Sequence, residues 1–382
     1  MSFASSGARE RQTHQVLAAR AKALVVSVDF GQPDFSDSVE EVRLLTETAG
    51  AEVSSTITSK RSAPDPALFV GSGKAHDIGL AARAGECELV VFDHALTPAQ
   101  QRNLEKELQT RVIDRTSLIL DIFAQRAQSH EGKIQVELAQ LQHLSTRLIR
   151  GWTHLERQKG GIGLRGPGET QLETDRRLIG ERVKMLRKKL AKLQAQRQSQ
   201  RRARERQGTF SVSLIGYTNA GKSTLFNALT KAGTYAADQL FATLDTTTRR
   251  IWIAGAGQIV ISDTVGFIRD LPHSLIEAFK ATLEETVRAD LLLHVIDMAN
   301  PVKLAQIDAV NQVLAEIGAD DIPQLQVFNK SDLAAVPPGI SRDLDGKIER
   351  IFLSARTGEG LDLLRSALKE YAEQAHPAEL LT

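Results

Sequence analysis

The stretch GYTNAGKST at residues 216 to 224 has two glycines separated by four residues and followed by Lys222 and Ser223. Strand-like VSLI precedes it and helix-like TLFNAL follows it, which is the context of a loop that wraps phosphates. Backbone N–H groups of such a loop and of the helix start point at the phosphates, Lys222 reaches the β- and γ-phosphates, and the Ser223 hydroxyl ligates Mg²⁺. The spacing therefore predicts a nucleoside triphosphate site.

The stretch FNKSD at residues 328 to 332 selects the base. Asp332 is expected to accept hydrogen bonds from N1–H and the exocyclic amine of guanine, while Asn329 holds the other edge. Adenine presents the wrong pattern at those atoms, so its binding would leave buried groups unpaired at about 1 to 3 kcal/mol each. Ser354 and Ala355, in the weaker motif LSART, are expected near the base. Guanine is therefore favoured over adenine.

Two further stretches could sense the γ-phosphate. In SDTVGF, at 262 to 267, Asp263 is expected to hold Mg²⁺ through water, and the Gly266 N–H to contact the γ-phosphate, so that the following segment moves when this phosphate leaves. In LFATLDTTT, between a helix and the next strand, one hydroxyl must reach the metal, and we choose Thr243 over three later threonines. Lys222, Thr243 and Gly266 are thus the expected catalytic residues.

Phe267 follows DTVG at the position where Ras-type enzymes carry a glutamine that orients the attacking water. No phenylalanine side chain can position water by hydrogen bonding. We therefore expect slow intrinsic hydrolysis, accelerated when a partner orders the mobile segments or supplies the missing group.

Composition places these motifs in a multidomain protein. A chain of 382 residues with 42% apolar residues is expected to form two or three domains with real cores. No apolar run approaches the roughly 20 residues that span a bilayer, and the N-terminus lacks a secretory signal. The single cysteine, Cys87, excludes a disulfide framework and a cysteine-cluster zinc site. We expect a cytoplasmic protein that is a monomer when free.

Three regions with different patterns follow one another along the chain, so the predicted fold class is α/β. Residues 1–121 alternate strand-like and helical runs, which predicts a small parallel α/β subdomain, with 1–22 flexible. Residues 122–207 carry two heptad-like apolar stripes around a Gly-rich stretch at 160–168, which predicts a coiled-coil-like antiparallel helical hairpin with this stretch at its tip. Residues 208–373 predict a mostly parallel sheet whose polar strand ends form one nucleotide pocket, followed by a short tail at 374–382.

The charge is concentrated in the hairpin. The chain has a formal net charge of +1, yet residues 176–206 contain thirteen Lys or Arg against Glu181 and Glu205, a local charge of +11. A one-signed block is typical of a polyanion contact, because each neutralised phosphate releases counterions. A solvated helix face is the alternative. We favour contact with nucleic acid.

Taken together, GYTNAGKSTLFN, FATLD, SDTVGFIRDLP, FNKSD and above all GGIGLRGPGETQLETDRR resemble the HflX family of ribosome-associated GTPases. The resemblance extends over nearly the whole chain, including FVGSGKAHDI and VFDHALTPAQQRNLEKEL in the first region. It implies a GTP- and GDP-binding protein that contacts rRNA on the large ribosomal subunit and splits stalled or idle ribosomes, notably under heat stress.

The resemblance also implies a set of site residues. Mg²⁺ is expected at Ser223 and Thr243, and Asn219 matches a residue that coordinates K⁺ in some related GTPases. The implied nucleotide contacts are Gly216, Tyr217, Thr218, Asn219, Ala220, Gly221, Lys222, Ser223, Phe241, Ala242, Thr243, Leu244, Asp245, Asp263, Thr264, Val265, Gly266, Asn329, Lys330, Ser331, Asp332, Ser354, Ala355 and Arg356.

Other interpretations remain open at this point. The chain could assist ribosomal subunit assembly, or it could be an RNA-binding or remodelling protein for which GTP is only a structural ligand. The Gly-rich tip could be a flexible linker. GSGKAHD at 71 to 77 lacks the spacing of a phosphate loop and is expected to be a turn before a helix, although some family members are reported to use ATP through this region.

Overall fold

The computed structural model describes residues 21–32, 34–158, 167–205, 209–231 and 239–375. They divide into two compact units, one formed by Met1–Gln125 with Val136–Leu186 and the other by Arg126–Gln135 with Arg187–Thr382. The α/β fold class is confirmed, with two largely parallel sheets and a helical region. No helix in the described ranges is long and apolar enough to cross a bilayer. The segments 1–20 and 376–382, which include most of the expected flexible N-terminus and short tail, lie outside the description.

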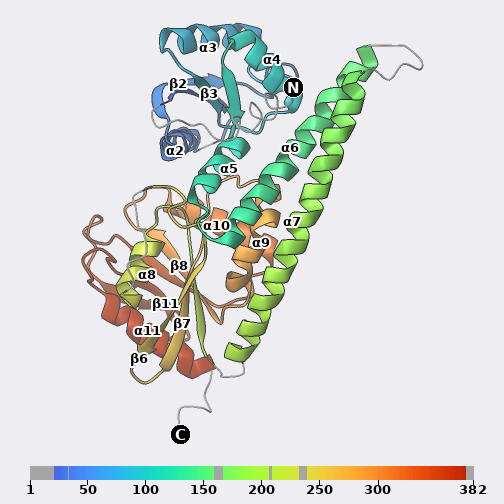
Figure 1. The fold of residues 1–382 in the computed structure, drawn as a ribbon. Coiled ribbons are helices and arrows are strands. Elements are labelled where there is room, and N and C mark those ends of the chain that lie inside the picture. Colours follow the sequence, from blue (N-terminus) through green and yellow to red (C-terminus); the bar gives the residue numbers. More distant parts are fainter. Residues whose placement is uncertain (1–20, 33, 159–166, 206–208, 232–238, 376–382) are drawn as a thin grey trace. The chain divides into compact units, whose positions relative to one another are not determined.

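The first unit is built on a four-stranded parallel sheet with the strand order β2-β1-β3-β4. Its central strands are buried because both faces are covered, and they accordingly read as continuous apolar runs such as LVVF. Figure 1 shows helices α2, α3 and α4 around this sheet. The elements are β1 (Lys22–Asp29), α2 (Phe35–Thr48), β2 (Glu52–Lys60), α3 (Ser72–Ala84), β3 (Leu89–Phe92), α4 (Pro98–Leu108), β4 (Arg111–Asp114) and α5 (Arg115–Arg126).

The N-termini of helices α4 and α3 are each set by residues with a clear local preference. Thr97 caps α4 by accepting from the Gln100 N–H, Gln100 returns the contact, and Pro98 occupies the first turn. Gly71, with φ +83°, precedes α3, and the rest of GSGKAHD already forms the first turns of this helix, so the predicted turn is limited to Gly71. Arg61 donates to the Val70 carbonyl beside that turn.

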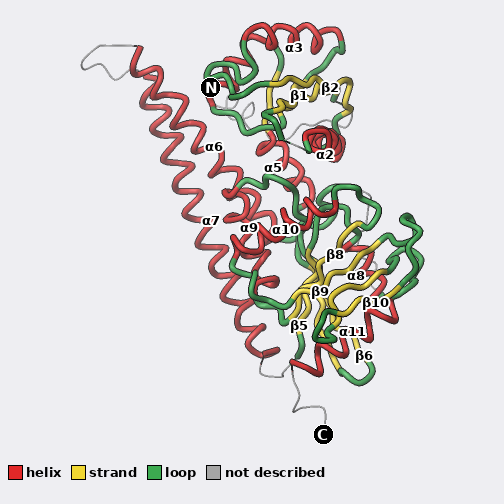
Figure 2. Tube along the Cα trace, turned by 180° about the vertical axis from the view of Figure 1, so that it is seen from behind, coloured by secondary structure: helices red, strands yellow, loops and turns green. Residues whose placement is uncertain are grey.

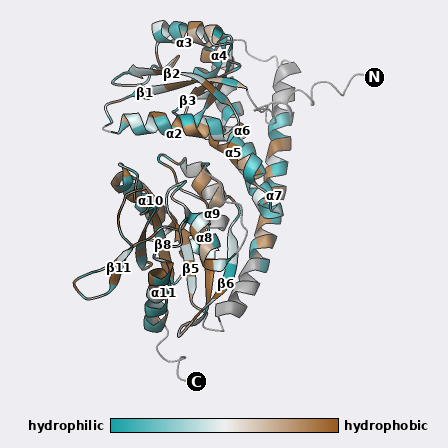
Figure 3. Cartoon of the chain, turned by 90° about the vertical axis from the view of Figure 1, so that its left-hand side faces the viewer, coloured by the Kyte–Doolittle hydropathy of each residue, from teal (hydrophilic) through white to brown (hydrophobic). Residues whose placement is uncertain are grey.

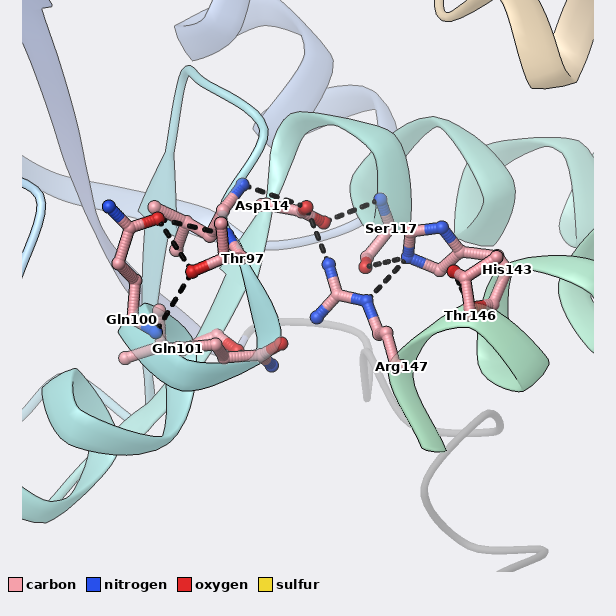
Figure 4. Close-up of polar contacts among 10 residues, drawn as sticks. Thr97, Gln100, Gln101, Asp114, Ser117, His143, Thr146 and Arg147 are labelled. Carbon is pink, nitrogen blue, oxygen red and sulfur yellow. Dashed lines mark hydrogen bonds and ion pairs between the residues drawn. The ribbon is translucent and has the colours of Figure 1, made fainter. Parts of the chain in front are cut away.

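A polar network ties part of helix α6 (His130–Gln158) to the same unit (Figure 4). Asp114, at the end of β4, accepts from the Ser117 N–H at 3.0 Å and from the Arg147 guanidinium at 2.5 Å. Arg147 Nε also donates to His143 Nε2 at 2.8 Å, and the Ser117 hydroxyl lies 3.3 Å from the same nitrogen. These contacts join the end of β4 to helices α5 and α6.

A cavity of about 320 Å³ lies next to this network, between β4 and helices α4, α5 and α6. Asp121 lines it, and this carboxylate accepts no hydrogen bond from any residue in the described part of the chain. Burial raises the pKa of Asp121 to about 6, and the positive charge of Arg111 offsets part of the effect.

Helices α6 and α7 (Pro167–Glu205) form the helical region. Ile134, Leu138, Leu186 and Leu190 of the predicted apolar stripes are buried. Within the first unit, Arg182 on α7 donates to Glu137 on α6 at 2.7 Å. Residues 160–166 of the expected Gly-rich tip lie outside the described residues. One expectation was wrong: Pro167 and Gly168 form the first turn of α7, where proline is tolerated because its missing N–H would have no partner there.

The second unit contains a seven-stranded sheet with the order β10-β11-β9-β8-β5-β7-β6, drawn in yellow in Figure 2. Strands β11, β9, β8, β5 and β7 are neighbours and pair in parallel, in agreement with the predicted mostly parallel sheet, while β6 and β10 pair antiparallel at its two edges. The strands are β5 (Ser211–Ile215), β6 (Thr247–Ile253), β7 (Gly257–Asp263), β8 (Leu291–Asp297), β9 (Gln324–Asn329), β10 (Gly339–Arg342) and β11 (Ile348–Phe352).

Helices cover both faces of this sheet. Figures 1 and 2 both place α9 and α10 on one face and α8 and α11 on the other. Figure 3 shows hydrophobic residues, in brown, along the central strands, and Leu293, Val295 and Val327 are fully buried there. The parallel strands bring their carboxyl ends to one edge of the sheet, where the predicted polar motifs meet. The helices are α8 (Lys222–Thr230), α9 (His273–Val287), α10 (Lys303–Ile317) and α11 (Leu361–Ala375).

Candidate nucleotide-binding and GTPase site

The phosphate loop connects β5 to α8, as the motif requires. Gly216 has φ +142°, and a Cβ atom there would lie 2.2 Å from the Val295 carbonyl oxygen of the neighbouring strand. Gly221 has φ +91°, and its missing Cβ leaves room for the side chain of Asn329. Gly216 is therefore required by the close approach of the Val295 backbone, and Gly221 by its positive φ and the close approach of the Asn329 side chain. The loop leads directly into the N-terminus of α8, whose free N–H groups favour an anion.

Lys222 is buried against this loop. Its ammonium group donates to the carbonyls of Gly216 at 3.0 Å and Tyr217 at 2.9 Å. Burial lowers the pKa of Lys222 to about 8, and the nearby carboxylate of Asp263 offsets part of this effect. A phosphate bound at the loop would add negative charge beside the ammonium and favour its charged form.

Three oxygen-bearing side chains converge next to Lys222. The Ser223 hydroxyl lies 2.7 Å from the Thr243 hydroxyl and 2.7 Å from Asp263 Oδ2, and Thr243 donates to the same Oδ2 at 3.2 Å. Burial raises the pKa of Asp263, while hydrogen bonds from Ser223 and the charge of Lys222 oppose this. Asp263 Oδ1 is buried and has no partner in the described part of the chain. A set of hydroxyl and carboxylate oxygens with an unsatisfied buried oxygen fits Mg²⁺, which prefers oxygen ligands.

The base-recognition motif has two parts with different surroundings. Asn329 is buried and bridges two loops: its Nδ2 donates to the Ala220 carbonyl at 2.9 Å, and its Oδ1 accepts from the Ala355 N–H at 2.9 Å. Asp332 is exposed, and its carboxylate accepts no hydrogen bond from the residues that the structure describes. Asn329 therefore holds the phosphate loop and the LSART loop together, while Asp332 is available for a base.

The segment after β7 lies against the phosphate loop. Phe267 donates from its N–H to the Gly216 carbonyl at 3.1 Å and accepts from the Thr218 N–H at 2.7 Å. Its side chain is fully buried. A Cβ atom at Gly266 would lie 2.8 Å from Thr218 and 3.1 Å from Lys222 Nζ, so only glycine fits between the two segments. The Thr264 hydroxyl is turned away, donating to the Leu214 carbonyl at 2.6 Å.

Ten of the expected contacts line the pocket at the phosphate loop, and Asp245, Lys330 and Arg356 are among those that do not. Asp245 binds the start of α6, Lys330 forms an ion pair with Asp297 at 2.7 Å, and Arg356 is exposed. The residues that line the pocket at the loop are Thr218, Asn219, Gly221, Lys222, Ser223, Thr224, Gln239, Phe241, Ala242, Thr243, Thr264 and Gly266. Two lining residues were not among the expected contacts: Thr224, the last residue of GYTNAGKST, and Gln239, which directly precedes LFATLDTTT.

The chain is 57% identical over 350 residues to GTPase HflX of Escherichia coli (strain K12), an alignment that covers 91% of this chain and 82% of that protein. The chain belongs to the GTPase HflX family. GTPase HflX of Magnetococcus marinus is 49% identical, covering 88% of this chain and 78% of the relative. The family resemblance predicted from the motifs is thus confirmed.

Family models and a solved structure agree with this membership of the HflX family. Residues 36–124 match the model "GTP-binding GTPase N-terminal", 126–204 match "GTP-binding GTPase Middle Region", and 211–330 match "50S ribosome-binding GTPase". The crystal structure of SsGBP in complex with GDP is similar with a TM-score of 0.51 and 25% identity, covering 92% of this chain and 99% of that one.

Membership of the HflX family makes the chain a GTPase, which converts GTP and water to GDP and phosphate. Among its own residues, the N–H groups of the loop and of the start of α8 would hold the phosphates, and Lys222 would supply positive charge beside them. Ser223 and Thr243, with Asp263, would hold Mg²⁺, which neutralises phosphate charge when bound. Phe267 contributes no hydrogen-bonding group for the attacking water.

Proposed function

We propose that this GTPase binds the large ribosomal subunit in its GTP form and splits stalled or idle ribosomes in the cytoplasm, acting as a monomer. The ribosome association is supported by the match of residues 211–330 to the model described as a 50S ribosome-binding GTPase. Splitting is the finer part of the proposal. In this scheme the free energy of binding to the ribosome separates the two subunits, and GTP hydrolysis then permits release of the protein.

The observation that carries the RNA contact is the unpaired positive charge on α7. Arg177 pairs with Glu181, and Arg182 pairs with Glu137. The remaining cations between 176 and 192 are exposed and make no ion pair with any residue that the structure describes: Arg176, Lys184, Arg187, Lys188, Lys189 and Lys192. Unpaired cations along one helix suit a phosphate backbone, because each contact releases counterions.

Lys184, Lys188 and Lys192 recur every four residues and therefore lie along one face of α7. Replacing all three by glutamine should weaken binding to large subunits and reduce the slope of log affinity against log salt by about 2 to 3, since each phosphate contact contributes roughly 0.7 to 0.9. Affinity for GTP should stay at the wild-type value. An unchanged salt slope would contradict the RNA contact.

The role of the Gly-rich tip needs a separate experiment. Deleting residues 160–168 should leave GTP affinity intact and slow the splitting of intact ribosomes followed by light scattering. Splitting at the wild-type rate would refute the role of the tip.

Two other functions predict different results. Preferential binding to immature particles would indicate subunit assembly instead. RNA affinity that is insensitive to Lys222→Ala would indicate that GTP is only a structural ligand.

Slow intrinsic hydrolysis and potassium dependence belong to the same proposal. The buried Phe267 supports a slow rate in the absence of the ribosome, with the ribosome ordering the site. Asn219 lies in the phosphate loop with φ +62° and lines the pocket. We propose that it helps to bind K⁺, so hydrolysis should be faster in K⁺ than in Na⁺; equal rates would remove this part of the proposal.

A further inference from the structure

The segment that carries Thr243 is attached at both ends to the junction between α5 and α6. At one end, the guanidinium group of Arg126 donates to Gln239 Oε1. At the other end, the Asp245 carboxylate accepts from the Gln128 N–H at 2.8 Å, the Ser129 N–H at 2.8 Å and the Ser129 hydroxyl at 2.6 Å. All of these residues belong to the second compact unit.

The contact at Asp245 is closely fitted to the start of α6. Ser129 caps this helix, because its hydroxyl oxygen accepts from the Gly132 N–H at 2.8 Å while its proton goes to Asp245. A Cβ atom at Gly132 would lie 2.1 Å from Asp245 Oδ1, so no side chain fits there without displacing the carboxylate. A negative charge at a helix N-terminus is also favoured by the helix dipole.

Between these two attachments, Phe241, Ala242 and Thr243 line the nucleotide pocket. Thr243 is only two residues from Asp245, and two residues span at most about 7 Å. While Asp245 remains bound to the start of α6, the Thr243 hydroxyl is therefore kept near Ser223 and Asp263. The start of α6 acts as a fixed support for the residue expected to ligate the metal.

We infer that Asp245 is a positioning residue of the GTPase reaction, which holds Thr243 at the metal by binding the first turn of α6. The inference rests on the assignment of Thr243 to the metal. Because coupling between two sites is reciprocal, a nucleotide that orders Thr243 must also stabilise the Asp245 contact and the amides that it binds. The contact at the first turn of α6 therefore depends on which nucleotide is bound.

The variant Asp245→Asn tests this, with Asp343→Asn as the matched control. Asp343 also accepts two backbone N–H groups, from Asp345 at 3.0 Å and Lys347 at 2.9 Å, but in the turn between β10 and β11. The readout is the affinity for a nonhydrolysable GTP analogue divided by the affinity for GDP. Asp245→Asn should lower this ratio and the single-turnover hydrolysis rate by about tenfold, since charge-assisted contacts are lost; Asp343→Asn should change neither.

Hydrogen exchange of the full-length protein provides a second readout. The amides of Gln128, Ser129 and Gly132 should exchange more slowly with the GTP analogue than with GDP, and Asp245→Asn should remove the difference. A lower unfolding midpoint for Asp245→Asn with an unchanged affinity ratio and hydrolysis rate would overturn the inference, leaving Asp245 as a structural cap. An unchanged ratio for Thr243→Ala would overturn both the inference and the metal assignment.

Discussion

Asn329→Ala should weaken the folded protein as well as its nucleotide binding. The Asn329 side chain is 2% exposed, and its two 2.9 Å hydrogen bonds join the Ala220 carbonyl to the Ala355 N–H. Truncation leaves both backbone groups buried and unpaired, at about 1 to 3 kcal/mol each. With each group near the middle of that range, the total loss is about 4 kcal/mol, which lowers the unfolding midpoint by about 8 to 16 °C in a unit of roughly 200 residues.

The matched variant is Asp332→Ala, three residues away on the same motif. Asp332 is exposed and accepts no hydrogen bond from the described residues, so its removal should leave the midpoint of the nucleotide-free protein within about 2 °C of wild type. Affinity for GTP should nevertheless fall at least about 100-fold, because two charge-assisted hydrogen bonds to guanine are worth about 1.5 to 3 kcal/mol each.

Differential scanning fluorimetry without nucleotide and titration with a fluorescent guanine nucleotide measure the two effects separately. Asn329→Ala is expected to lose both stability and affinity, and Asp332→Ala only affinity. The reasoning fails if Asn329→Ala unfolds at the wild-type temperature without nucleotide, because Asn329 would then act only on the base.

Two further predictions concern Phe267 and Asp121. Phe267→Gln should not speed intrinsic hydrolysis, because the Phe267 side chain is fully buried, and it should lower the unfolding midpoint by burying an amide; a tenfold faster single-turnover rate would contradict this. Asp121 has its pKa raised from 3.8 to about 6 in the folded state, which therefore binds the proton more tightly than the unfolded state. The free energy of unfolding should fall as pH rises from about 4 to about 6, by up to about 3 kcal/mol. Asp121→Asn should thus stabilise the first unit at pH 8 but not at pH 4, and denaturation curves shifted equally at both would exclude this effect.

The central strands of both sheets could be predicted from the sequence because burial on two faces requires continuous apolar runs, as in LLLHVID of β8. The edge strands β6 and β10 were not predicted, because an edge strand is not buried on both faces and so lacks a continuous apolar run. β6 reads TTRRIWI, with both arginines and Trp252 exposed, and β10 reads GISR without a fully buried residue. An edge strand with polar side chains has no strong apolar pattern, and its pairing is decided by the neighbouring strand.

Within the site, sequence motifs predicted the local structure of short continuous segments. The turn at Gly216 and the helix start at Lys222 follow from a few adjacent residues. The sequence could not show that Asn329 bridges two loops or that Asp245 binds the start of α6, because these contacts join residues more than 100 positions apart. Such pairings depend on the assembled fold and leave no periodic signal.

The most direct test of the account is the affinity of this GTPase for large ribosomal subunits in three nucleotide states. Cosedimentation would be measured with a nonhydrolysable GTP analogue, with GDP and without nucleotide, with Lys222→Ala alongside. We predict the tightest binding with the analogue and no dependence on nucleotide for Lys222→Ala. Equal affinity of the wild-type protein in all three states would contradict the claim that the guanine nucleotide controls ribosome binding.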